Sequence, residues 1–129
     1  MRAPVIYLDR AAIRPGRLDD LRRAFGELAA FVEAHEPALI SYAVYFSEDG
    51  TRSSVMHVHR DEASLIRHKD VIQPLLPPFA DLLRLTQIEV FGEIGLELRA
   101  QLEAKLRLLG DEALLFNRPH AGFLRAGEG

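Results

Sequence analysis

Two histidines one residue apart, His57 and His59, are the residues of this chain best suited to chemistry. They lie in a strand-like segment. Because strand side chains alternate, both imidazoles share one face while Met56 and Val58 take the other. Imidazole changes its charge near neutral pH, which suits it to proton transfer and to metal binding.

A metal bound by His57 and His59 would need further ligands, and His68 and Glu89 are the side chains that could complete the set. The same His-x-His spacing occurs in cupin metal sites, but a cupin needs many more strands than this helix-rich chain offers. We therefore interpret the histidines as a hydrogen-bonded or pocket-lining pair and predict no metal. Glu89 can also accept a proton from a phenol or bind one of the histidines.

His68 and two tyrosines are further candidates. His68 shares a helical row with Leu65 and Ile72, so it points toward packed structure, where a histidine is either a base or a hydrogen-bonded neighbour of the core. Tyr7 and Tyr45 can form aromatic walls whose hydroxyls reach a ligand, and interface tyrosines would have the same pattern.

Strand-like and helix-like segments follow one another in the order β-α-β-β-α-β over residues 4–92. Strands are predicted at 5–8, 39–46, 53–59 and 86–91, and helices at 15–36 and 61–73. Asp49-Gly50 between two alternating runs indicates a hairpin, and Asp61 is placed to cap the second helix. This order predicts an α+β, ferredoxin-like domain over 1–94, with both helices on one face of an antiparallel sheet.

Residues 95–129 continue beyond that domain and carry a leucine-rich helix. Its stripe comprises Leu98, Leu102, Leu106 and Leu109, and it ends at Gly110-Asp111. Such a helix can cover its own sheet or cross to a second subunit, and the sequence leaves both open. Residues 113–116 are a candidate short strand.

The strand faces predict where a site would lie. One set is almost wholly apolar and is expected under the helices: Ile6, Leu8, Ile40, Tyr42, Val44, Phe46, Met56, Val58, Ile88 and Val90. The opposite set mixes apolar and titratable side chains: Tyr7, Ser41, Ala43, Tyr45, Val55, His57, His59, Gln87, Glu89 and Phe91. We expect this mixed face to form a homodimer interface through Tyr7, Tyr45, Val55 and Phe91, and to line a cavity for a small organic ligand.

Composition excludes several classes of function. A net charge of −3 gives no electrostatic footprint for nucleic acid or an anionic membrane surface. No run approaches the roughly 18 apolar residues of a membrane span, and the N-terminus lacks the apolar core of a signal peptide. The chain has no cysteine, which rules out thiolate chemistry. A cytoplasmic protein is the expectation.

Several segments resemble a known family, the antibiotic biosynthesis monooxygenase type of dimeric α/β barrel. They are Pro15-Gly16-Arg17, Glu36-Pro37 before Leu39-Ile40-Ser41-Tyr42, Ser47-Glu48-Asp49-Gly50, and Arg60-Asp61-Glu62-Ala63 followed by His68. The resemblance places His68 on the recurrent helix-two histidine of that family and His57 at the position of its strand-three glutamate. The chain contains no tryptophan, so it departs from the haem-degrading branch.

The resemblance implies a homodimer with a cavity in each protomer. In enzymatic members it implies cofactor-free oxygenation of phenolic or polyketide-like substrates, with His57 and His68 as candidate catalytic residues and Tyr7, Tyr45, His59 and Glu89 around the ligand. The alternative is a non-catalytic, dimeric small-molecule-binding or stress-response module on the same fold.

Overall fold

The computed structural model describes residues 4–125 and confirms the predicted order of elements. The strands and helices are β1 (Val5–Ile13), α1 (Leu18–His35), β2 (Ser41–Phe46), β3 (Arg52–His59), α2 (Glu62–Ile72), β4 (Leu83–Phe91), α3 (Leu96–Leu109) and β5 (Gly110–Asn117). Two short 3-10 turns, η1 (Gln73–Leu75) and η2 (Pro77–Asp81), connect α2 to β4, where prolines prevent the α-helix from continuing.

The sheet has the strand order β2-β3-β1-β4-β5. The first four strands pair antiparallel, as the ferredoxin-like plan requires, and β5 adds a parallel edge strand beside β4. Gly50 has φ +72° in the predicted β2–β3 hairpin, a conformation that glycine adopts without a Cβ clash. The β1–β4 pairing contains a bulge, which lets Leu85 and Ile88 both face inward despite their odd spacing.

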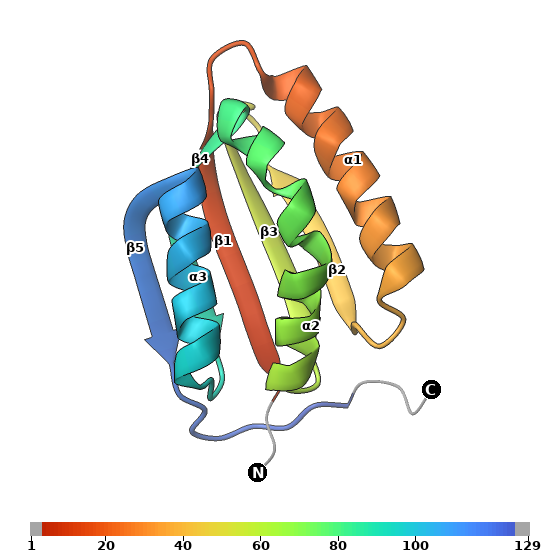
Figure 1. The fold of residues 1–129 in the computed structure, drawn as a ribbon, viewed down its shortest axis with the longest axis vertical. Helices are drawn as coiled ribbons and strands as arrows, with labels where there is room; N and C mark the ends of the chain where they lie inside the picture. Colours follow the sequence, from red (N-terminus) through yellow and green to blue (C-terminus); the bar gives the residue numbers. More distant parts are fainter. Residues whose placement is uncertain (1–3, 126–129) are drawn as a thin grey trace.

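All three helices of the described chain lie over the same face of the sheet (Figure 1). The leucine-rich helix α3 packs on β4 and β5 of its own chain, and the four stripe leucines are buried. Residues 126–129 of the predicted C-terminal segment lie outside the described residues. The candidate strand at 113–116 is present as part of β5.

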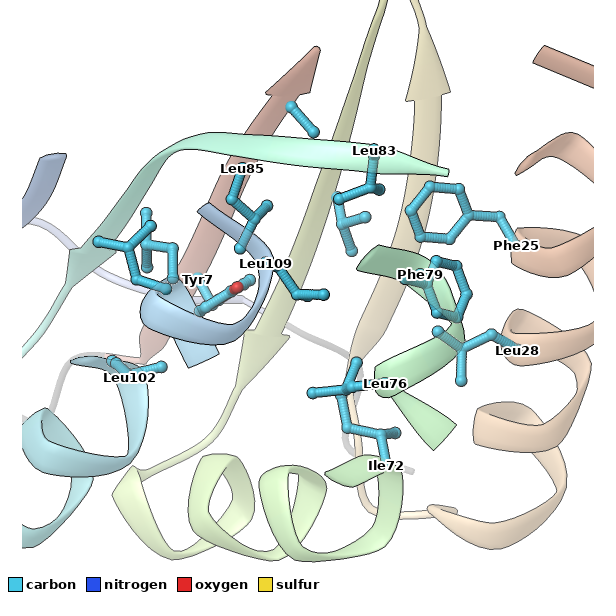
Figure 2. Packing of buried hydrophobic residues seen from close by; sticks show 14 of the residues in the cluster. Tyr7, Phe25, Leu28, Ile72, Leu76, Phe79, Leu83, Leu85, Leu102 and Leu109 are labelled. Atoms are coloured by element: carbon cyan, nitrogen blue, oxygen red, sulfur yellow. The ribbon is translucent and has the colours of Figure 1, made fainter. Parts of the chain in front are cut away.

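The apolar core fills the layer between sheet and helices. Figure 2 shows Phe25 and Leu28 of α1 beside Phe79 of η2, and the Phe25 and Phe79 rings are 5.1 Å apart. Leu102 and Leu109 lie on α3, in the same cluster as Tyr7 of β1. One continuous core therefore connects the ferredoxin-like elements with the C-terminal helix.

The predicted faces of β1 and β3 are wrong, whereas those of β2 and β4 are right. Tyr7, Val55, His57 and His59 are buried under the helices, and Met56 points to the open face. The prediction placed the more apolar half of each strand in the core. In β1 and β3 the inward polar groups instead find hydrogen-bond partners within the sheet and on the helices, so their burial is tolerated. Tyr7 and Val55 therefore cannot form the predicted dimer interface.

The start of α2 depends on one capping contact. The Asp61 carboxylate accepts a hydrogen bond from the Ser64 backbone N–H at 2.9 Å. Asp61→Ala should lower the free energy of unfolding by about 1 kcal/mol, because one N–H at the helix start loses its acceptor. Asp61→Asn keeps an acceptor and is the control. Urea unfolding by circular dichroism measures both, and equal stability of all three proteins would contradict the capping role.

Candidate active site

Three buried histidines meet between the sheet and α2. Nδ1 of His57 lies 2.6 Å from Nε2 of His59, and Nδ1 of His59 lies 2.7 Å from Oγ of Ser64 on α2. The His57 ring stacks on Tyr7 with ring centroids 4.2 Å apart, and the centroids of the His57 and His68 rings are 4.4 Å apart. Strand β3 and helix α2 therefore bring the three predicted histidines into one cluster.

A carboxylate orients the third histidine. Oε2 of Glu36, just beyond the end of α1, lies 2.7 Å from Nδ1 of His68, and both side chains are buried. Among the described residues, Nε2 of His68 has no hydrogen-bond partner. A histidine held by a carboxylate at one nitrogen and free at the other has the arrangement of an oriented general base.

A second polar group lies on the other side of the histidines. Tyr7 donates its hydroxyl hydrogen to Asp9 Oδ2 at 2.7 Å, and Nζ of Lys105 on α3 donates to the Tyr7 oxygen at 2.6 Å. Lys105 Nζ is also 3.4 Å from Asp9 Oδ2. This buried group joins β1 to the C-terminal helix.

Burial controls the charges of the cluster. It lowers the pKa of His57 and His68 well below the usual range and that of His59 to about 4, because a desolvated imidazolium is unfavourable. It raises the pKa of Glu36 to about 7, an effect that Arg67 partly offsets. The histidines are therefore neutral in the native protein at neutral pH, and Glu36 is the group that titrates there.

The Glu36–His68 dyad can thus act as a unit. Below pH 7, the protonated carboxyl donates to Nδ1 of His68. Above pH 7, the carboxylate accepts from Nδ1–H, and the Nε2 lone pair is available to take a proton. The negative charge of the ionised dyad raises its affinity for that proton, so it is a base suited to neutral pH.

A small cavity lies beside this cluster. It has a volume of about 30 Å³, enough for a water or a dioxygen molecule. Its polar wall is formed by Asp9, Tyr42, His57, His68 and Lys105, and leucines and phenylalanines form much of the rest. Larger depressions adjoin the cluster, one of about 500 Å³ reaching Glu36 and Tyr42 and one of about 120 Å³ between α2 and α3.

Two predicted site residues lie elsewhere. Tyr45 is 55% exposed, and Glu89 points to the open face, where it accepts a hydrogen bond from Asn117 at 3.1 Å. Of the predicted set, Tyr7, His57, His59 and His68 come together, on the face opposite to the one predicted. The predicted mixed set is therefore split: Val55 and His57 line the cavity, whereas Tyr45 and Glu89 do not.

Sequence reasoning missed four cluster members: Asp9, Glu36, Lys69 and Lys105. The lysines had a readable signal. They are the only two lysines among 16 basic residues, and each interrupts the apolar stripe of its helix. Asp9 alternates with Tyr7 on one strand face, which is a weaker signal. Glu36 follows a helix end, and its inward direction depends on the loop that comes next.

No group of three or more potential metal ligands in residues 4–125 has the arrangement of a metal site. Nδ1 of each clustered histidine is already directed at another side chain. Within the same range, no helix is long and apolar enough to span a membrane.

Comparison with known proteins supports the fold. No protein-family model matches the chain, and no curated protein matches it in sequence. Among solved structures, MupZ from Pseudomonas fluorescens has a TM-score of 0.69 at 21% identity, covering 97% of this chain and 91% of that chain. This match spans nearly the whole chain, so it includes the C-terminal helix and strand.

Two further structures carry descriptions of activity. SnoaB from Streptomyces nogalater, described as a cofactor-independent oxygenase, has a TM-score of 0.60 at 17% identity, covering 71% of this chain and 94% of that chain. A candidate antibiotic biosynthesis monooxygenase from Caulobacter crescentus has a TM-score of 0.62 at 18% identity, covering 69% and 88%. The chain thus has the fold of antibiotic biosynthesis monooxygenase-like proteins, as the sequence resemblance implies.

The neutral histidines predict acid sensitivity. Between pH 6.5 and 4.5, unfolding lets His57, His59 and His68 bind protons, while Glu36 releases the one it holds in the native state. From these four groups the net uptake is about two protons, so their contribution to the free energy of unfolding should fall by about 3 kcal/mol for each pH unit of acidification at the centre of this range.

Urea unfolding from pH 4.5 to 7 measures this slope. His59→Gln should lower the number of protons taken up on unfolding by about one, which makes the slope shallower. His120→Gln, at an exposed histidine outside the cluster, is the control and should leave the slope unchanged. A stability that does not change over this pH range would show that the clustered histidines are not held neutral.

Proposed function

We propose that the protein is a cofactor-independent monooxygenase that removes a proton from a small phenolic or polyketide-like substrate and lets the resulting carbanion react with O₂. The observation that carries this proposal is the unpaired Nε2 of His68, a residue that lines the cavity, with Glu36 bound to the opposite nitrogen. The likeness in fold to a described cofactor-independent oxygenase supports the same class of reaction.

The chemistry needs one base and a site that excludes water. An acidic CH₂ of the substrate gives a proton to His68, and the carbanion transfers an electron to O₂. The two radicals combine, the peroxide recovers the proton from His68, and the hydroperoxide loses water. One CH₂ and one O₂ give one carbonyl and one H₂O, so no external reductant is required. The cavity has room for O₂ next to the base.

The neighbouring groups have supporting roles in this mechanism. His57 lies against both Tyr7 and His68, so it positions the rings around the reacting group. Nε2 of His59 contacts Nδ1 of His57, and Nδ1 of His59 contacts Ser64 on α2, so His59 fixes the orientation of the His57 ring. We assign His68 as the catalytic base and His57, His59 and Glu36 as positioning residues.

A non-catalytic binding module is the second candidate. The observation that favours it is the small cavity, since most polar atoms around it already bond to one another. Such a module would bind a ligand without exchanging its protons, and that difference can be measured.

We also propose a homodimer formed through the open face of the sheet. Among the described residues no helix covers this face (Figure 1). It exposes several large apolar side chains: Met56, Phe91, Leu115 and Tyr45. Large apolar side chains exposed together on one face of a sheet commonly mark a protein interface. Pairing two copies face to face would bury it, and a stable dimer of this type removes on the order of 2,000 Å² from water.

Proton removal should depend on the dyad. With a hydroxylated anthrone as probe, whose central CH₂ is acidic, His68→Gln should lower kcat/KM for oxygen uptake by about 10²–10⁴-fold. The wild-type rate should rise with pH through about 7, because the ionised dyad is the base, and Glu36→Gln should remove this inflection. An oxygen electrode measures the rate, and His120→Gln is the control.

The same probe in deuterated, oxygen-free buffer separates the two parts of the proposal. Exchange of its acidic hydrogen without oxygen uptake in air would retain the base and reject the oxygenase. Full oxygen uptake by His68→Gln would reject His68 as the base. Binding with neither exchange nor oxygen uptake would favour the non-catalytic module.

The dimer can be tested with a matched pair of substitutions. Met56 on the open face and Leu75 in η1 are each 37% exposed, so Met56→Glu and Leu75→Glu add the same charge at equal exposure. Light scattering at micromolar concentration should give a dimer for the wild type and Leu75→Glu, and a monomer for Met56→Glu. A monomeric wild type would reject the interface.

A further inference from the structure

The only two lysines of the chain lie next to each other in its interior. The other 14 of the 16 basic residues are arginines. Lys69 on α2 and Lys105 on α3 are 5% and 9% exposed. Arginine is always charged, whereas a buried lysine can lose its proton, so the choice of lysine at these two positions has a chemical consequence.

The side-chain nitrogens of the two lysines differ in their hydrogen-bond partners. Lys105 Nζ contacts the Tyr7 oxygen and the Asp9 carboxylate, at 2.6 and 3.4 Å. Within the described residues, Lys69 Nζ is buried and has no hydrogen-bond acceptor. A charged ammonium without an acceptor in the interior is unfavourable, so Lys69 is held as a neutral amine in the free protein, and its charged form needs a negatively charged group from outside these residues.

An open space is available for that group. The crevice between α2 and α3, of about 120 Å³, is lined by both lysines and by Gln73 and Gln101. The amide oxygen of Gln101 is also buried without a partner in the described structure, and rotating that amide would turn its NH₂ group into a donor. Leu76 and Lys105 line both this crevice and the small cavity, so the two spaces are neighbours.

We propose that this crevice binds a carboxylate group of the substrate, with Lys69 and Lys105 as its cationic contacts and the apolar part of the molecule directed past Leu76 toward His68. The inference deepens the proposed function, since it assigns the polar end of the substrate of that site. A carboxylate fits because two ammonium groups can donate to its two oxygens, and the adjoining walls are apolar.

Binding should change the protonation of Lys69. The charged and titratable groups around it are Lys105 from α3, Asp9 from β1, His57 from β3 and His68 from its own helix. Burial, the charge of Lys105 and a hydrogen bond that Lys105 donates to the neutral amine lower the pKa of Lys69, and the charge of Asp9 acts in the opposite direction. A bound carboxylate adds the missing negative charge, so Lys69 takes up a proton as the ligand binds.

Hexanoate and 1-hexanol are suitable probes, because they share one alkyl chain and differ in charge. Calorimetry at pH 7.5 in two buffers of different ionisation enthalpy should show hexanoate binding with uptake of a proton, and at least tenfold weaker binding of hexanol. Labelling with ¹³C-lysine gives side-chain signals from only two residues, so the Lys69 signal should move from an amine to an ammonium shift when hexanoate is added.

Lys69→Met keeps the length of the side chain and removes its charge. It should fold as stably as the wild type or more so, because an unpaired buried amine is replaced by an apolar group, yet it should bind hexanoate at least tenfold more weakly. Arg107→Met is the matched control: it removes one positive charge from an exposed position of α3 outside the crevice.

The results separate this inference from the proposed reaction. His68→Gln should still bind hexanoate, so binding without oxygen uptake would retain the carboxylate site and reject the oxygenase. Equal binding of hexanoate and hexanol, unchanged binding by folded Lys69→Met, or an unchanged Lys69 signal at saturating hexanoate would each overturn the carboxylate site. The absence of any hexanoate binding by the wild type would also overturn it.

Discussion

Hydrogen bonding inside the layer between sheet and helices is the constraint on which the rest of this structure depends. Strands β1 and β3 direct Tyr7, Asp9, His57 and His59 inward, and each must find a partner away from water. The partners come from neighbouring strand residues, from Ser64 on α2 and from Lys105 on α3. The positions of the helices and the chemistry of the site are therefore set by the same contacts.

The elements of the fold could be predicted from the sequence because their signals are local. The Asp49-Gly50 hairpin, the Asp61 cap and the leucine stripe of residues 98–109 each specify a short segment, and the structure confirms all three. Which face of β1 and β3 is buried under the helices could not be predicted in the same way. Apolar alternation identifies two faces, but which face is buried depends on partners that are distant in sequence, such as Tyr7 and Lys105. Glu36 was missed as a site residue because its contact with His68 joins positions 32 residues apart.

The C-terminal extension belongs to the site as well as to the core. Helix α3 buries its leucine stripe on β4 and β5 and also carries Lys105 to Asp9 and Tyr7. Without this helix, Asp9 and Tyr7 on the inward face of β1 would lose their cationic partner Lys105 and become exposed to water. A chain limited to the ferredoxin-like elements would therefore need a different set of residues at these positions. The parallel strand β5 anchors the extension to the edge of the sheet.

The few unsatisfied polar atoms show where this interior differs from a purely structural one. Three of them, Nε2 of His68, Nζ of Lys69 and Oε1 of Gln101, belong to residues that line the cavity or the adjoining crevice. Buried atoms without partners reduce stability, and a sequence selected for stability alone would replace a lysine at position 69 with an apolar residue of similar length. Their position around two neighbouring spaces is explained if the missing partners belong to a ligand. The Glu36–His68 dyad then acts on the apolar side of that ligand, while the lysines hold its charged end.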